Sequence, residues 1–155
     1  ESKILLNLQQ LGVRQAESLR TEIFTSENDK KKAREIVDQL VGGQPFGFVQ
    51  TNTGVPRKDL PAGFGQQWLR ENKSLTQYIE VGQDFSPFEY NINIQFEILR
   101  LADAVCIPDS VFYHACHAMD KPIDFVYFAR GQSVYDRVKP LHSVTENIVY
   151  DLKGV

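Results

Sequence analysis

Residues 86–98 read SPFEYNINIQFEI, and the fold class depends on how this stretch is interpreted. From Tyr90 to Ile98 apolar side chains alternate with polar ones, which is typical of a β-strand with one buried face. Residues 86–89, however, have the pattern of a helix start, with serine as N-cap, proline at the first helical position and glutamate at the third. We favour the helix, because this start pattern is specific and the residues that follow fit it. As a strand, the same stretch would indicate an α+β fold with a mostly antiparallel sheet.

A helix over these residues would carry Glu89, Asn93, Glu97 and Arg100 on one polar face. Apolar residues would then occupy two flanking stripes. The sequence therefore predicts a helix with one polar face in this segment.

The residues after this stretch predict a β-α-β unit. Residues 104–107 form a short apolar run, and Asp109 or Ser110 caps a helix that extends to about Met119. After the turn at Lys121-Pro122, residues 123–129 form a strongly apolar strand. Such continuous apolar character is typical of a parallel strand covered by helices on both faces.

The remaining segments continue this alternation. Strands are expected at residues 46–50, 75–81 and 147–152, and short helices at 64–71 and 133–138. From residue 44 onward the order is β-α-β-α-β-α-β-α-β. This order predicts an α/β fold with a layered, mostly parallel sheet and right-handed crossover helices.

Residues 1–43 read as a pair of helices in front of this core. In the first helix, apolar residues recur three and four positions apart between Leu5 and Ile23. The second begins with a capping box at residues 26–29 and ends at Gly42-Gly43. We expect a single domain over residues 1–155, with the helical pair at 1–43 and the α/β core at 44–155.

Composition narrows the class of protein. The chain has 155 residues and a formal net charge of -3, which argues against a nucleic-acid-binding domain because such domains present a basic face. No apolar stretch reaches the roughly 18 to 20 residues of a membrane helix, so no membrane association is expected. Cys106 and Cys116 lie in apolar surroundings and are expected to be buried thiols in a reducing compartment, which favours a cytoplasmic location. No dinucleotide or P-loop motif occurs, so no cofactor is predicted.

The predicted carboxyl ends of the strands carry small, polar or charged residues. In an open parallel sheet, ligands bind outside these ends. Free backbone N–H groups, carboxylates and a guanidinium would converge there. The predicted ligand-binding residues are Thr51, Asn52, Thr53, Gly54, Asp84, Asp109, Ser110 and Arg130.

Within this set the side chains suggest distinct roles. Asp84 and Asp109 are candidates for a general base or for binding hydroxyl groups. Arg130 and the backbone amides near Ser110 are candidates for holding an anion. The alternative is that these are ordinary turn and cap residues, as such residue types often are.

The histidines do not form a metal motif. His114 and His117 fall on one face of the expected helix, and His142 is the only other histidine in the chain. A third ligand at a suitable spacing is missing, so no metal site is predicted. We expect His114 and His117 to lie partly exposed on a polar helix face.

Residues 89–130 resemble the later half of the nucleoside deoxyribosyltransferase-type α/β fold. The shared features are a polar-faced helix, Ala102-Asp103-Ala104-Val105 at the start of a strand, a short helix, and Lys121-Pro122-Ile123 at the start of another. That family carries a catalytic glutamate in the short helix, whereas residues 110–114 contain none. The resemblance therefore implies a layered α/β fold, and the catalytic residue of that family is not matched in this sequence.

Two hypotheses on function remain open. In the first, the chain binds a small ligand, a nucleotide- or sugar-like anion, at the strand ends, with or without turnover. In the second, it is a non-catalytic interaction or assembly subunit of a homo- or hetero-oligomer, formed through the N-terminal helices. The apolar residues between Leu5 and Ile23 support the second hypothesis, because amphipathic helices at chain ends often pack on partners.

Overall fold

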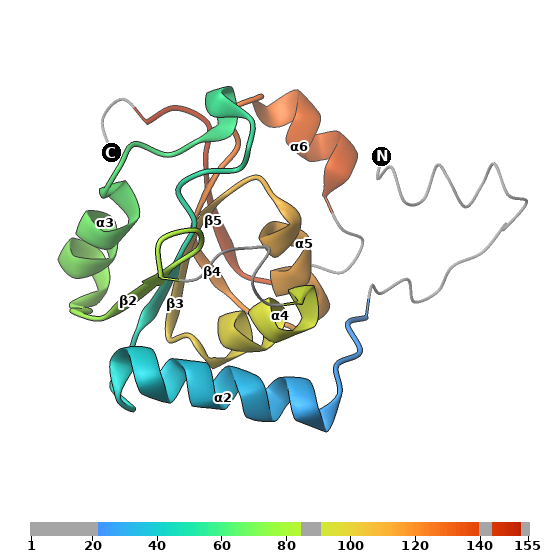
Figure 1. Cartoon of the computed structure of the whole chain (residues 1–155). Helices are drawn as coiled ribbons and strands as arrows, with labels where there is room; N and C mark the ends of the chain where they lie inside the picture. Colours follow the sequence, from blue (N-terminus) through green and yellow to red (C-terminus); the bar gives the residue numbers. More distant parts are fainter. Residues whose placement is uncertain (1–21, 85–90, 140–143, 153–155) are drawn as a thin grey trace, which may run out of the picture.

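Five parallel strands form the central sheet, in the order β2-β1-β3-β4-β5 (Figure 1). The computed structural model describes residues 22–84, 91–139 and 144–152. The strands are β1 (Gly47–Val49), β2 (Tyr78–Glu80), β3 (Ala104–Pro108), β4 (Ile123–Tyr127) and β5 (Glu146–Val149). The predicted α/β fold is thus confirmed, and the alternative of a mostly antiparallel sheet is wrong.

Helices cover both faces of this sheet. They are α2 (Glu27–Val41), the 3-10 helix η1 (Pro56–Lys58), α3 (Phe64–Lys73), α4 (Ile92–Leu101), α5 (Val111–Ala118) and α6 (Gln132–Val138). Helix α3 packs on one face, and α2, α4 and α5 build the core on the other (Figure 1). Among the helices of the described residues, none combines the length and the apolar character that a membrane crossing requires.

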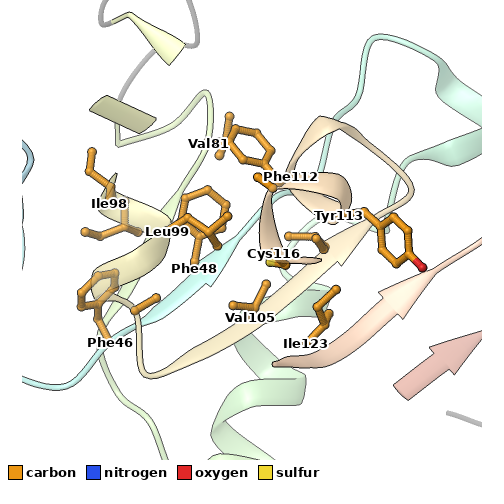
Figure 2. Close-up of a cluster of buried hydrophobic side chains, with 14 of the residues drawn as sticks. Phe46, Phe48, Val81, Ile98, Leu99, Val105, Phe112, Tyr113, Cys116 and Ile123 are labelled. Atoms are coloured by element: carbon orange, nitrogen blue, oxygen red, sulfur yellow. The ribbon is translucent and has the colours of Figure 1, made fainter. Parts of the chain in front are cut away.

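Strand β3 divides the core into two layers. All five of its residues are buried, and successive side chains point to opposite faces, as the pleat of a strand requires. Val105 and Ile107 join the cluster under α4 and α5. Figure 2 shows this cluster, with Val105, Phe48 and Phe112 among its labelled side chains. Ala104 and Cys106 join the smaller cluster under α3. The continuous apolar run in the sequence therefore reflects burial on both sides.

The segment that decides the fold is helix α4. Asn91 is its N-cap and accepts a hydrogen bond from the backbone N–H of Ile94 at 3.0 Å. The predicted start at residues 86–89 lies outside the described residues, of which the nearest begin at 91. The preference for a helix over a strand is confirmed.

The polar face of α4 is not fully exposed to solvent. Glu97 is only 4% exposed, whereas Ile92 is 44% exposed. The Glu97 carboxylate accepts hydrogen bonds from the Thr25 hydroxyl at 2.7 Å and from Arg100 Nε at 3.2 Å. Helix α2 packs against α4 and buries this side. Contacts between elements, which periodicity does not encode, thus decide which face of α4 meets water.

Helix α2 agrees with its predicted signals. Ser26 Oγ accepts from the N–H of Asp29 at 3.0 Å, and Asp29 Oδ2 accepts from the N–H of Ser26 at 3.1 Å. The helix ends at Gly42, whose φ of 60° lies in the left-handed region that favours glycine. The first predicted helix, within residues 1–21, lies outside the described residues.

Lys121 binds the backbone carbonyl groups at the carboxyl end of α4. Its Nζ donates to the carbonyl oxygen of Arg100 at 3.0 Å and also to that of Ala102. The last carbonyl groups of a helix have no partner within the helix, so a cation satisfies them both as a donor and as a charge. Burial of the side chain lowers the pKa of Lys121.

We expect Lys121→Met to destabilise the protein by about 1–3 kcal/mol, because two carbonyl groups lose a charged donor. Urea-induced unfolding measures the difference. Lys31→Met is the matched control, since Lys31 is an exposed residue of α2, and its effect should stay within about 0.5 kcal/mol. Equal effects of the two substitutions would contradict the role of Lys121.

Candidate functional site

The carboxyl ends of β1 and β3 form a topological switch point. These strands are neighbours in the sheet, but the chain leaves β1 toward α3 on one face and leaves β3 toward α5 on the other. A strand order of this kind opens a crevice between the two departing segments. Because all strands are parallel, the predicted loops after β1, β2, β3 and β4 lie at this same edge of the sheet.

A cavity of about 380 Å³ lies at this edge. Asn52, Thr53 and Gly54, three of the predicted residues, line it from the loop after β1. The end of β2 contributes Val81 and Gly82. A volume of this size is typical of small-ligand pockets.

The opposite wall of the cavity comes from two helices. Helix α4 contributes Ile92 and Gln95, and helix α5 contributes Val111 and Phe112. Ile92 and Val111 are 44% and 51% exposed, so apolar side chains meet solvent at the rim. Gln50 also lines the cavity. None of the described residues that line it is charged.

Gln50 joins the two sides of the switch point. It was not among the residues predicted from the sequence. Its Oε1 accepts from Ser110 Oγ at 2.6 Å, and its Nε2 donates to the carbonyl oxygen of Asn52 at 3.2 Å. The side chain is 6% exposed and lines the cavity. A glutamine that directly follows an apolar strand was the available signal.

The amino end of α5 uses its own amides. Ser110 is the N-cap, and its Oγ accepts from the N–H of Phe112 at 3.3 Å. The N–H of Tyr113 donates to the carbonyl oxygen of Ser110 at 3.1 Å. Two of the amides that were candidates for holding an anion are therefore engaged in capping the helix.

A charged cluster lies beside Ser110. Arg130 Nη2 donates to Asp109 Oδ2 at 2.9 Å, and Lys58 Nζ lies 3.5 Å from the same oxygen. The Asp109 side chain is 6% exposed, against 18% for Lys58 and 32% for Arg130. Two cations thus share one carboxylate, which leaves one net positive charge. Asp109 and Arg130 were predicted from the sequence. Lys58 was not, because it is distant from both along the chain.

Asp84 and Thr51 have partners within the sheet edge. Asp84 Oδ2 accepts from the backbone N–H of Glu80 at 2.7 Å and closes the turn after β2. The Thr51 hydroxyl donates to the carboxylate of Glu80. Neither residue lines the cavity described above. Asp84, a candidate base, is therefore placed as a turn residue.

The two histidines of α5 differ from the expectation of a shared polar face. His114 is exposed, but His117 is 3% exposed and its Nε2 lies 2.7 Å from Glu146 Oε2. His142 lies outside the described residues. Within residues 22–84, 91–139 and 144–152, no group of three His, Cys, Asp or Glu side chains is placed to hold a metal ion.

The fold of this chain is similar to that of a solved protein structure. A glycosyl transferase family 9 protein from Veillonella parvula DSM 2008 superposes with a TM-score of 0.70 at 13% sequence identity. The match covers 94% of this chain and 47% of that chain, so this chain spans about half the length of that protein. No family model matches the sequence, and neither does any curated protein. At this identity the likeness shows a shared fold.

We expect Ser110→Ala to destabilise the protein by about 1–2 kcal/mol, because α5 loses its N-cap and Gln50 loses a buried donor. Thermal unfolding followed by circular dichroism measures the change. Ser133→Ala, at an exposed position of α6, is the control and should change stability by no more than about 0.5 kcal/mol. A Ser110→Ala protein as stable as the control would show that the Gln50–Ser110 contact is dispensable.

Proposed function

We propose that this chain binds a small nucleotide- or sugar-like ligand at the β1/β3 switch point. The observation that carries the proposal is the cavity of about 380 Å³, lined by the loop after β1, the end of β2 and the amino ends of α4 and α5. Ligand sites of open α/β sheets lie in such crevices.

The chemistry of the edge supports a ligand with two dissimilar parts. The cavity offers apolar side chains and amide groups, which suit an uncharged ring with hydrogen-bonding edges. Lys58 and Arg130, next to Ser110, supply one net positive charge, which suits an anionic substituent such as a phosphate. The Gln50–Ser110 contact separates these two regions.

The structural neighbour supports the same class of ligand. Its name says that it is a glycosyl transferase, and proteins of that kind handle sugars. Because this chain spans about half of that protein, the proposal for this chain is limited to binding. Asp109 and Asp84, the carboxylates considered as bases, are both engaged with other groups.

Assembly is a second candidate function. Phe24 is 81% exposed near the start of the described residues, shortly after the segment at 1–21, whose sequence pattern is amphipathic. An exposed aromatic side chain beside an amphipathic segment favours contact with a partner. A native-mass measurement tests this candidate: a strict monomer with no bound partner would count against it.

Ligand binding is tested by thermal shift and isothermal titration calorimetry with UDP-glucose, ADP, uridine and glucose 1-phosphate. A ligand at about 100 times its Kd stabilises a protein by about 2.7 kcal/mol, so we expect a rise in Tm of several degrees for at least one probe. Ile92→Arg should abolish this rise, because it places a charge in the uncharged cavity. Leu101→Arg, at a similarly exposed position of the same helix, should leave it unchanged.

Lys58→Ala separates the two parts of the site. It should weaken binding of the phosphate-bearing probes by about ten- to a hundredfold, since a charged hydrogen bond contributes about 1.5–3 kcal/mol, and should leave binding of uridine unchanged. The proposal fails if none of the four probes shifts the Tm, or if Ile92→Arg binds as well as the unchanged protein.

A further inference from the structure

A buried polar cluster joins α5, α6 and β5 at the opposite end of α5 from the cavity. Its centre is Glu146, the first residue of β5. Glu146 Oε2 lies 2.7 Å from Nε2 of His117 on α5, and Oε1 accepts from the hydroxyl of Tyr135 on α6. The side chains of His117 and Glu146 are 3% and 9% exposed. Both oxygens of one carboxylate thus receive donors from two different helices.

The second ring nitrogen of His117 identifies its protonation. Nδ1 accepts from the backbone N–H of Val144 at 3.1 Å, so the ring proton lies on Nε2 and is donated to Glu146. Because a donor faces each of its oxygens, Glu146 is an ionised carboxylate in this arrangement. Protonation would remove its charge and turn one oxygen into a donor that faces the Tyr135 hydroxyl.

The environment of Glu146 favours this ionised form. Burial alone raises the pKa of the carboxyl, but the hydrogen bonds from His117 and Tyr135 outweigh it and hold the pKa below its ordinary value of 4.5. The cluster therefore stabilises the native state fully above pH 4.5, and this contribution is lost as the pH falls through the lower native value.

Helix α6 has few other attachments. It has seven residues, all described, of which none is buried, and its N-cap Gly131 makes no side-chain cap bond. Tyr135 carries its contacts with the rings of Phe128, at a centroid distance of 5.3 Å, and Tyr150, at 6.4 Å. A helix this short is not stable alone, so it depends on its contacts with the core, which Tyr135 and Val138 make.

Helix α6 is linked along the chain to the charged cluster of Asp109, Lys58 and Arg130, at the carboxyl ends of the strands. The helix begins at Gln132, two residues after Arg130, which donates to Asp109 at 2.9 Å. Movement of α6 away from β5 would therefore loosen the loop that carries Arg130.

We infer that the His117–Glu146–Tyr135 cluster is a pH-sensitive latch that holds α6, and with it the loop of Arg130, against the sheet. Acidification opens α6 locally before the remainder of the chain unfolds. This inference goes beyond the proposed function, and it does not require that any ligand binds.

Other titratable groups face the cluster. Tyr113 of α5 is fully buried, its ring lies 4.7 Å from that of His117, and Figure 2 shows its hydroxyl pointing away from the apolar core. Burial, and then the nearby Glu146 charge, raise the pKa of Tyr113, so it stays a neutral hydroxyl in the acid range. Tyr150 follows β5, and Asp136 of α6 lies near it. Asp136 is therefore a second carboxylate to test beside Glu146.

Hydrogen–deuterium exchange of the full chain between pH 7 and pH 3.5 tests the latch, with rates corrected for the intrinsic effect of pH. In the unchanged protein, protection of residues 132–139 should fall on acidification, by up to about tenfold, while that of α2 falls less. Glu146→Gln should lower protection of α6 already at pH 7 and remove its pH dependence. Glu97→Gln is the matched control, since the Glu97 side chain on α4 is 5% exposed against 9% for Glu146, and α6 should keep its pH dependence.

Tyr135→Phe provides an independent variant, because it keeps the ring and removes only the hydroxyl donor. It should reduce the protection of α6 at pH 7 and flatten its pH profile, also if Glu146→Gln does not fold. Asp136→Asn should leave the profile unchanged. The inference is overturned if Tyr135→Phe keeps the full protection and pH profile of the unchanged protein, or if α6 and α2 lose protection in parallel.

Discussion

Burial of β3 on both faces is the constraint on which the rest of the structure depends. A strand with β1 on one side, β4 on the other and helices above and below has no exposed surface, so its residues must be apolar throughout. Parallel neighbours also require crossover helices, and their handedness places α3 opposite to α4 and α5. The divergence of the chain at β1 and β3, and hence the cavity, follows from this arrangement.

The edge of the sheet separates apolar from charged chemistry. Gln50 reaches from the end of β1 to Ser110 at the start of α5, and the uncharged cavity lies on one side of this contact. On the other side, Asp109 receives both Lys58 and Arg130. Partial burial makes such a pair expensive to leave uncompensated, so the two cations stay close to the carboxylate. The division lets one edge present two different surfaces to a ligand.

Local signals in the sequence predicted the elements well. The capping box at Ser26, the glycine at residue 42 and the apolar runs of β3 and β4 each act over a few residues, and the structure agrees with them. The prediction of a helix within residues 86–98 was right, and its predicted start at 86–89 lies outside the described residues. The helix has Asn91 as its cap and buries Glu97, because α2 packs against this side and Thr25, just before α2, donates to the Glu97 carboxylate.

The sequence by itself determined the parallel α/β layers and the edge where polar loops gather, because periodicity and capping depend on near neighbours along the chain. Only the tertiary structure decided which polar residues meet. Lys58 and Asp109 are far apart in sequence, as are His117 and Glu146. Each pair forms because the fold brings distant segments of the chain side by side. Asp84, which looked equivalent to Asp109 in the sequence, instead closes its own turn. Pairing across the sheet depends on how the strands are ordered, and no local pattern carries that order.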